Sequence, residues 1–269
     1  MYIIGINAFH GDSSACLLKD GKLVAAAEEE RFRRIKHWAG FPSQSIKWCL
    51  SEAGIKLENV NHIAINQDAK ANINKKILFA LHKRPNFKMI IDRFKNMRRR
   101  LNLKDYILNE FPDSRFNGLF HLVEHHLSHL SSAFHVSPFD QAVTVSVDGF
   151  GDFASTAWGI GEGVKINLEE RIYFPHSLGI FYQALTQFIG FHNYGDEYKV
   201  MGLAPYGKPT FIKHMRQIVK LKLNGNFELN LNYFRHHKEK IEYLWDKGSP
   251  NVGTLYSSEL IKLLGPARL

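Results

Sequence analysis

The 269-residue chain is 45% hydrophobic and 23% charged, the balance of a globular protein with room for two domains and a sizeable core. It contains no apolar run near the ~20 residues of a membrane-spanning helix and opens directly on a strand pattern, so we expect neither a membrane anchor nor a signal peptide. The net charge of +9 is confined to residues 75–104, where eleven Lys and Arg stand against one acid, Asp92, so that this segment carries +10 and the rest of the chain −1.

The first predicted unit begins with a β-hairpin. Residues 3–7 and 13–18 have the composition of strands, and Asp20-Gly21 is a strong signal for a two-residue turn. The two cysteines, Cys16 and Cys49, lie in apolar patterns, which predicts reduced core thiols of a cytoplasmic protein. The further elements expected are a helix from an N-cap at Ser43 to about Ala53, a strand at 60–65, helices in a basic insertion at about 70–112, a strand at 120–123 and a helix at 127–134.

A second stretch repeats the pattern of this hairpin. Residues 143–148 form a strand, and the next strand begins Ser155-Thr156-Ala157 as the earlier one begins Ser13-Ser14-Ala15. We interpret this as one α/β unit used twice, with halves at 1–140 and 141–269, although two short apolar hairpins also resemble each other by chance. The second half has helices expected at 178–189 and 255–264 but no closing strand–helix–strand. The sheet edge would then be bare, so we expect the sequence to be truncated.

Two histidines and one acid form the most informative group of polar residues. His125 and His129 are spaced i and i+4, which places both on one side of a helix. This spacing is equally typical of polar residues on an exposed helix face, and the nearby His126 and His135 make the region generally rich in histidine. Asp148 ends an apolar strand and favours a ligand role, because ligands gather at the carboxyl ends of strands in α/β sheets. Imidazole and carboxylate groups together suit a divalent metal such as Zn or Fe(II).

Three other polar segments carry weaker signals. Gly149 and Gly151 allow backbone N–H groups to approach an anion, but an ordinary hairpin turn has the same pattern. His10 lies in the matching turn of the first hairpin, and an unperturbed imidazole pKa of about 6.5 suits a general base, although a solvent-exposed turn histidine explains it equally well. The charge run at 28–37 is typical of a solvated face, with a phosphate contact by Lys36 or Arg31 as the alternative.

Taken together, these stretches resemble the O-carbamoyltransferase family of antibiotic-modifying and nodulation-factor-modifying enzymes. The matching residues are Gly5-Ile6-Asn7 with His10 and Ser13-Ser14-Ala15; Glu28-Glu29-Glu30-Arg31-Phe32 with Lys36-His37; Phe41-Pro42; His125-His126 with His129 and Ser132-Ala133-Phe134; Val147-Asp148-Gly149; and the segment from Asp196 to Gly207. The resemblance runs from residue 2 to 269, broken by the basic insertion, and its last motif is long and specific.

The resemblance implies an actin-like ATPase fold built from duplicated ribonuclease-H-like halves. It also implies transfer of a carbamoyl group from carbamoyl-adenylate, made from carbamoyl phosphate and ATP, to a hydroxyl of an acceptor such as a sugar or natural product. The site residues implied by resemblance are the metal ligands His125, His129 and Asp148 (iron, with zinc as the alternative), the catalytic residues His10 (base for the acceptor hydroxyl) and Lys36 (contact with the intermediate), and the nucleotide-contacting Gly149, Gly151 and Ser13.

The resemblance places a second metal carboxylate and a separate adenylate-forming domain beyond residue 269. We therefore expect this chain alone to bind metal weakly and to make no carbamoyl-adenylate. Two alternatives stay open: a relative of the tRNA threonylcarbamoyl transferases that binds RNA phosphates through residues 75–104, and a non-catalytic nucleic-acid or partner-binding module that uses the same segment. The motif at 196–207 argues against the first, and a solvated helical arm explains the segment, so nucleic acid is not the expected partner.

Overall fold

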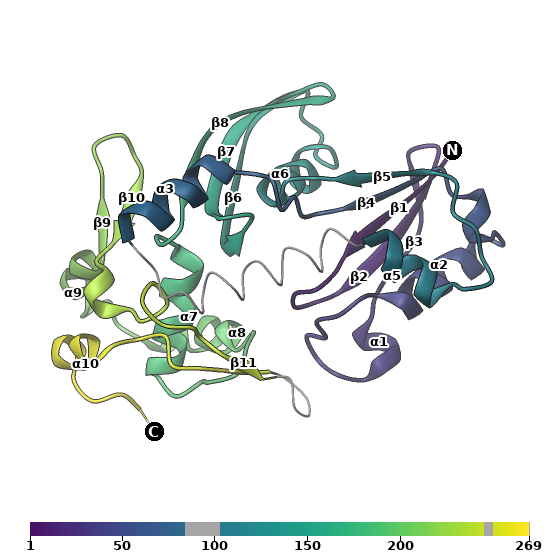
Figure 1. The fold of residues 1–269 in the computed structure, drawn as a ribbon. Helices are drawn as coiled ribbons and strands as arrows, with labels where there is room; N and C mark the ends of the chain where they lie inside the picture. Colours follow the sequence, from purple (N-terminus) through teal and green to yellow (C-terminus); the bar gives the residue numbers. More distant parts are fainter. Residues whose placement is uncertain (84–102, 245–249, 269) are drawn as a thin grey trace. The chain divides into compact units, whose positions relative to one another are not determined.

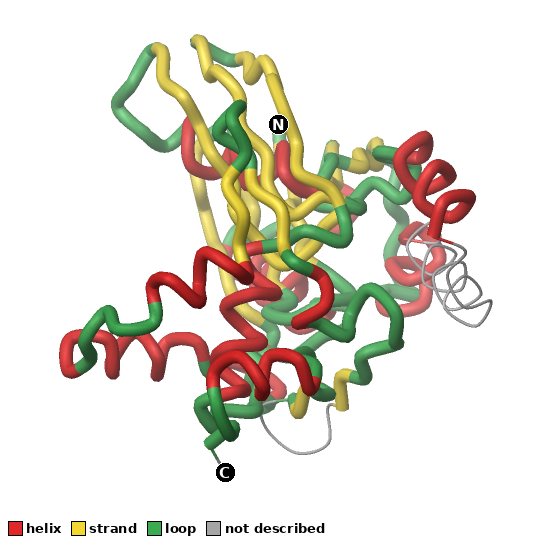
Figure 2. Tube along the Cα trace, turned by 90° about the vertical axis from the view of Figure 1, so that its left-hand side faces the viewer, coloured by secondary structure: helices red, strands yellow, loops and turns green. Residues whose placement is uncertain are grey.

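The computed structural model describes residues 1–83, 103–244 and 250–268, which fall into two compact units. Of the described residues, the first unit contains 1–69 and 103–125, and the second contains 70–83, 126–244 and 250–268. Both units combine strands and helices, so the expected α/β class is confirmed, whereas the duplication stays a prediction (Figure 1; Figure 2).

The elements follow one another along the chain as listed here, with η marking 3-10 helices. The first unit holds β1 (Tyr2–Asn7), β2 (Ser14–Lys19), β3 (Lys22–Glu28), α1 (Glu30–Arg33), α2 (Ser43–Glu52), η1 (Leu57–Asn59), β4 (His62–Ile65), α5 (Leu103–Glu110) and β5 (Leu119–Leu122). The second holds α3 (Ile73–Lys83), α6 (His125–Phe134, after its first residue), β6 (Gln141–Gly151), β7 (Ala154–Glu162), β8 (Lys165–Tyr173), α7 (Leu178–Phe188), α8 (Glu197–Leu203), η2 (Ala204–Tyr206), α9 (Ile212–Ile218), β9 (Val219–Leu221), β10 (Phe227–Leu229), η3 (Leu231–Tyr233), β11 (Tyr243–Leu244), β12 (Asn251–Val252) and α10 (Ser258–Leu264).

A five-stranded mixed sheet organises the first unit. Its order is β3-β2-β1-β4-β5, with antiparallel pairing among the first three strands of the chain and parallel pairing of β1 with β4 and of β4 with β5. Asp20 and Gly21 join β2 to β3 with φ angles of 50° and 79°, the left-handed conformation that a tight hairpin turn requires. The hairpin predicted from these two residues is confirmed.

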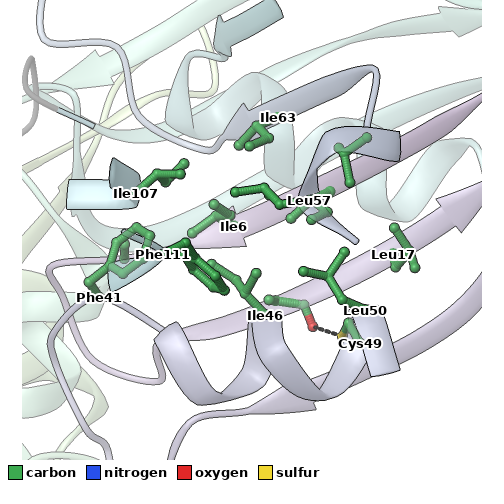
Figure 3. Close-up of a cluster of buried hydrophobic side chains, with 14 of the residues drawn as sticks. Ile6, Leu17, Phe41, Ile46, Cys49, Leu50, Leu57, Ile63, Ile107 and Phe111 are labelled. Atoms are coloured by element: carbon green, nitrogen blue, oxygen red, sulfur yellow. Dashed lines mark hydrogen bonds between the residues drawn. The ribbon is translucent and has the colours of Figure 1, made fainter. Parts of the chain in front are cut away.

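The core of the first unit is formed by the sheet together with α2 and α5 (Figure 3). Ile6 and Ile63 come from β1 and β4, Ile46 comes from α2 and Ile107 from α5, and each is at most 3% exposed. Close packing of such branched side chains holds the two parallel strands and the helices in one arrangement.

The two cysteines are free thiols, as predicted. Cys49 is fully buried, and its thiol donates a hydrogen bond to the carbonyl of Ala15 at 3.6 Å (Figure 3). Burial raises the pKa of the Cys49 thiol to about 11, so it stays protonated and unreactive at neutral pH. Burial also raises the pKa of Cys16, which is partly exposed.

A buried carboxylate serves the N-terminus of helix α2. The prediction that Ser43 is the N-cap is wrong, because Ser43 is already the first helical residue. The fully buried Glu29 accepts hydrogen bonds from the backbone N–H groups of Gln44 and Ser45 at 3.3 and 2.9 Å. It also pairs with Arg33 at 2.8 Å. A full negative charge on the first N–H groups of a helix is a stronger acceptor than a serine hydroxyl.

The second unit contains the antiparallel sheet β6-β7-β8, against which helix α6 packs. The hydroxyl of Thr144 in β6 donates to the carbonyl of Leu130 in α6 at 3.3 Å. Gly161 in β7 makes room for the ring of Phe134, since a Cβ at this position would lie 2.5 Å from the ring. A further core of this unit consists of Ile180, Ala184, Phe188, Ile218, Leu229, Phe234, Val252, Leu255 and Leu260.

Most of the expected elements are present with shifted ends. The strands expected at 60–65 and 120–123 are β4 and β5, and the helices expected at 127–134, 178–189 and 255–264 are α6, α7 and α10. The basic insertion is helical at α3 and α5, while its residues 84–102 lie outside the described part of the chain. Within the described residues, no helix combines the length and apolar character needed to cross a membrane. The division into halves at 140 and 141 stays a prediction.

Candidate metal centre

Helix α6 and strand β6 bring together the three predicted metal ligands. His125 and His129 lie one turn apart on α6, and Asp148 lies on β6. Each offers one ligand atom, and these atoms all lie within 4.8 Å of one another. The distance between His129 Nε2 and the nearer Asp148 carboxylate oxygen is 3.7 Å. The i, i+4 spacing on α6 and the position of Asp148 on β6 thus bring the three side chains together, and their role as metal ligands stays a prediction.

The donor set fits a borderline divalent metal. Bond lengths of about 2.0–2.2 Å to imidazole nitrogen and carboxylate oxygen place neighbouring ligand atoms roughly 3 to 4 Å apart. The 3.7 Å separation of His129 and Asp148 lies in that range. Two imidazoles and one carboxylate form the ligand set typical of Zn or non-haem Fe(II) with positions left open for other ligands.

The ring of His125 is oriented by the backbone of the first unit. Its Nδ1 lies 3.2 Å from the carbonyl oxygen of Asn66, which follows β4. A carbonyl only accepts hydrogen bonds, so Nδ1 carries the proton and the lone pair lies on Nε2. Metal-binding histidines commonly have this second interaction, which fixes the tautomer and the direction of the ring. His125 is 7% exposed, whereas the side chain of His129 is 47% exposed.

The neighbouring His126 has a packing role in the second unit. It is fully buried, and its Nδ1 bonds the hydroxyl of Ser146 on β6 at 2.8 Å. Helix geometry directs it away from His125 and His129, since residues at i and i+1 do not share a face. The histidines of α6 therefore fall into two groups. His125 and His129 are the predicted metal ligands, and His126 attaches the helix to the sheet.

The N-terminus of α7 holds the backbone of Asp148 in place. The hydroxyl of Ser177, the N-cap of α7, donates to the Asp148 carbonyl at 3.0 Å and accepts from the Ile180 N–H at 3.0 Å. Gly179 lies against the same peptide, since a Cβ there would be 2.6 Å from the Gly149 nitrogen. Sequence analysis missed Ser177 and Gly179 as positioning residues. The N-cap pattern was visible in the sequence, but nothing in it indicated what the cap would touch.

The turn after Asp148 leaves the regular ladder of the sheet. β6 pairs with β7 up to Val147, and pairing resumes only at Gly151, so the intervening residues are displaced from the strand. Gly149 donates its N–H to the Asp148 carboxylate at 2.6 Å, and space is open where its side chain would be. Such irregularities redirect side chains and expose backbone N–H groups. The turn is suited to an anion, and the nucleotide contacts of Gly149 and Gly151 stay a prediction.

His10 and Ser13 belong to the loop between β1 and β2 in the first unit. The His10 ring meets the His125 ring edge-on, with centroids 5.7 Å apart, which places His10 beside a predicted metal ligand. Ser13 is 1% exposed, and its hydroxyl donates to the carbonyl of Gly40 at 2.9 Å and accepts from the Gly40 N–H at 3.0 Å. These bonds make Ser13 an organiser of its own loop. Lys36 is exposed on the neighbouring loop.

The β1–β2 loop and the loop that carries Lys36 are joined by a carboxylate–imidazole contact that was not predicted from the sequence. His37 Nδ1 lies 2.8 Å from the Asp12 carboxylate, and both side chains are partly exposed, at 26% and 44%. The two residues adopt left-handed φ angles, 52° for His37 and 63° for Asp12. Neither residue has a helical or strand periodicity around it, and their separation in sequence gave no signal that they meet.

Comparison with known proteins shows the family of this chain. A family model for the carbamoyltransferase N-terminus matches residues 2–246. The chain belongs to the carbamoyltransferase family. Among relatives of this carbamoyltransferase chain, the protein sll1178 of Synechocystis sp. is 40% identical over 243 residues, which cover 87% of this chain and 40% of that protein. The nodulation protein NolNO of Sinorhizobium fredii is 35% identical over 227 residues, which cover 84% of this chain and 32% of that protein.

The carbamoyltransferase chain thus spans 40% of sll1178 and 32% of NolNO. Among solved structures, YeaZ from Pseudomonas aeruginosa covers 65% of this chain and 68% of its own, with 13% identity and a TM-score of 0.34.

Proposed function

We propose that this chain is the part of an O-carbamoyltransferase that moves a carbamoyl group from carbamoyl-adenylate to a hydroxyl of a small-molecule acceptor. The observation that carries the proposal is the convergence of His125, His129 and Asp148, whose ligand atoms lie within 4.8 Å in a chain of the carbamoyltransferase family. Carbamoyl-adenylate is an activated mixed anhydride, so transfer needs positioning, a base for the acceptor hydroxyl and an environment that favours the phosphate leaving group.

The three ligands would hold iron, with zinc as the alternative. A divalent metal bound there offsets negative charge on the phosphate of the leaving nucleotide. The side chains contribute orientation: Asn66 sets the tautomer of His125, and Ser177 fixes the backbone of Asp148. Both contacts would hold the ligands in place before the substrate binds.

The remaining roles follow from the family resemblance. His10, beside His125, is the base assigned to the acceptor hydroxyl, and Lys36 is the residue assigned to the carbamoyl-adenylate. Gly149, Gly151 and Ser13 are assigned to the nucleotide. The open space at Gly149 supports its assignment, whereas the hydrogen bonds of the buried Ser13 support a role in shaping the loop.

An actin-like fold with duplicated halves is part of the same proposal. Each unit contains three strands that pair antiparallel in chain order, β1-β2-β3 in the first and β6-β7-β8 in the second. The buried Ser13 and Ser155 lie at matching places, just before or at the start of the middle strand. Each hydroxyl donates to a loop carbonyl that follows the third strand, Gly40 for Ser13 and His176 for Ser155. These parallels support duplication of one α/β unit.

We assign synthesis of the donor, from carbamoyl phosphate and ATP, to a separate adenylate-forming domain. The greater length of the curated relatives supports this division. Under this proposal the chain uses carbamoyl-adenylate that is supplied to it.

Transfer from synthetic carbamoyl-adenylate tests the proposal. The Fe(II)-loaded chain is incubated with this donor and trifluoroethanol, and the carbamate ester is measured by mass spectrometry. We expect product with the wild-type chain and none when carbamoyl phosphate and ATP replace the donor. The His125→Ala/His129→Ala variant should lose transfer, while His62→Ala/His121→Ala, which removes a histidine pair on β4 and β5, should retain it. Absence of wild-type transfer would contradict the proposal.

A further inference from the structure

The hairpin between β6 and β7 closes on a turn that contains an unusual residue. Gly151 pairs with Ala154, which leaves Asp152 and Phe153 as a two-residue turn. Their φ angles are 47° and 76°, and a turn of this kind commonly has glycine at its second position. A bulky side chain in left-handed backbone costs free energy and persists only where its surroundings hold it.

The turn between β2 and β3 has the same backbone conformation with the usual residue. Asp20 and Gly21 adopt φ angles of 50° and 79°, close to those of Asp152 and Phe153. Space is open where a side chain at Gly21 would lie, so that turn is specified by its backbone alone. The difference indicates that the ring of Phe153 has a role that glycine cannot fill.

Helix α3 packs against this turn within the second unit. The ring of Phe79 meets the rings of Phe153 and Phe174 edge-on, with centroids 5.8 and 5.0 Å apart. Asn72, the residue directly before α3, donates from its side-chain amide to the carbonyl of Asp152 at 2.9 Å. Edge-to-face aromatic contacts and a paired turn carbonyl both stabilise the arrangement. Part of the basic insertion therefore holds the tip of this hairpin.

The start of α3 is itself fixed against the sheet. Asn72 has a left-handed φ of 56°, which asparagine tolerates, and its carbonyl accepts from the N–H groups of Lys75 and Lys76 at 3.0 and 3.1 Å. The ammonium group of Lys75 lies 5.2 Å from the centroid of the Tyr173 ring at the end of β8, a cation–π contact. The amide of Asn72 is thus held in the direction of the turn.

The segment Gly149–Gly151 lies between two such points of attachment. On one side, Ser177 of the α7 N-terminus holds the carbonyl of Asp148, and on the other side Asn72 holds the carbonyl of Asp152. The pairing of β6 with β7 stops before this segment and resumes only at its last residue, so the ladder does not fix its backbone. Backbone N–H groups bind an anion well only when they are held in one orientation.

We propose that Asn72, Phe79 and Phe153 are positioning residues that hold the segment Gly149–Gly151 in the conformation that binds the nucleotide part of the donor. This inference rests on the proposed transferase function and gives part of the basic insertion a role in it. Because α7 holds Asp148 separately, the contacts of α3 act on nucleotide binding and leave metal affinity unchanged.

The first test measures the rigidity of the segment by nitrogen-15 relaxation of the Gly149 and Gly151 amides. The wild type should give order parameters of about 0.85, and Asn72→Gly/Phe79→Ala should give values below about 0.6. Glycine accepts the φ of Asn72, so the variant removes the contacts without adding backbone strain there. Ile77→Ala/Leu78→Ala is the matched control, because both side chains are 53% exposed on the same helix, and it should behave as the wild type.

The second test measures nucleotide and metal affinity by calorimetry, with AMP as the unreactive nucleotide. Asn72→Gly/Phe79→Ala should bind AMP about tenfold more weakly and bind Fe(II) as the wild type does. Phe153→Gly restores the usual turn residue but loses the contact with α3, so it should fold and still bind AMP weakly. In transfer from synthetic carbamoyl-adenylate, both variants should raise the KM of the donor and leave kcat nearly unchanged.

Four outcomes separate the possibilities. Unchanged order parameters or AMP affinity in Asn72→Gly/Phe79→Ala would overturn the inference and leave the transferase function intact. Equal losses in Ile77→Ala/Leu78→Ala would overturn it as well, because the effect would then come from the stability of α3. A parallel loss of Fe(II) affinity would overturn the separate roles of α3 and α7. Absence of transfer by the wild type would overturn the proposed function, while the order parameters and AMP affinity still decide the positioning role.

Discussion

Individual buried polar residues hold the loops and helix ends of this protein. Glu29, His125, His126 and His236 are each at most 7% exposed, and each satisfies backbone or hydroxyl groups that would otherwise be buried without partners. Leaving such a group unsatisfied costs about 1–3 kcal/mol, and more for a charged group. Stability in this protein therefore depends on a few polar side chains as well as on the apolar cores.

Replacing Glu29 by alanine should destabilise the chain by about 3 kcal/mol, since it removes the acceptor for the start of α2 and leaves Arg33 without its buried partner. Urea unfolding of the variant measures this change. Glu28→Ala is the matched control, because the neighbouring Glu28 is exposed, and its effect should stay within about 0.5 kcal/mol. Equal effects of the two substitutions would contradict the role of Glu29.

His236 should make the second unit sensitive to acid. Burial lowers the pKa of His236 from 6.5 to about 4, while its Nε2 donates to the Pro175 carbonyl at 2.8 Å. Below pH 6.5 the unfolded chain takes up a proton that the folded chain does not bind. Stability is therefore fully present above that pH and is lost as the pH falls toward 4, by an amount on the order of 3 kcal/mol.

Denaturant unfolding at pH 7 and pH 4.5 measures this effect. His236→Gln keeps a donor for Pro175 but cannot titrate, so it should lose less stability between the two pH values than the wild type. His135→Gln alters an exposed histidine and should keep the wild-type difference. The same pH dependence in all three proteins would show that His236 is not responsible.

Two helices, α6 before strand β6 in the chain and α7 after it, position the predicted metal ligands. α6 supplies His125 and His129, and the N-terminus of α7 fixes the strand peptide that carries Asp148. The sequence predicted the first contribution, because i, i+4 spacing on a helix determines a shared face. It could not predict the second, because the approach of α7 depends on tertiary packing and leaves no periodic pattern.

Gly179→Ala should weaken metal binding by tenfold or more. The added methyl would lie 2.6–2.7 Å from backbone atoms of Asp148 and Gly149, which cannot move aside without displacing the carboxylate. Fe(II) titration of the purified variant gives the change in affinity. Gly202→Ala is the matched control, because no atom lies within 4 Å of its added methyl, and it should bind metal as the wild type does. Unaltered affinity in Gly179→Ala would contradict the positioning role.

Turn and cap chemistry illustrate how far local sequence determines local structure. The hairpin predicted from Asp20-Gly21 is confirmed because two residues in the left-handed conformation suffice to specify the turn. The prediction of Ser43 as the N-cap was wrong because Glu29, distant in sequence, supplies a carboxylate acceptor to the start of the same helix. The Asp12–His37 pair was missed for the same reason: contacts between loops depend on the whole unit.

At the scale of the whole molecule, we do not expect the excess positive charge to define the function. Residues 75–104 carry +10, and this charge is separate from the predicted metal ligands in sequence. We expect binding of tRNA to be weak and abolished at physiological salt, since it would rest on phosphate contacts alone. Gel shifts at low and physiological salt measure this. A shift that persists at physiological salt and disappears when Arg98, Arg99 and Arg100 become alanine would instead support the RNA-binding alternative.

Metal analysis of the reconstituted chain tests whether His125, His129 and Asp148 together bind a divalent metal. We expect one Fe(II) or Zn(II) per wild-type chain at saturating metal, and the same stoichiometry in His62→Ala/His121→Ala, which lacks the exposed histidine pair of β4 and β5. His125→Ala/His129→Ala should bind none. Equal metal content in this variant and the wild type would show that the two histidines do not bind the metal.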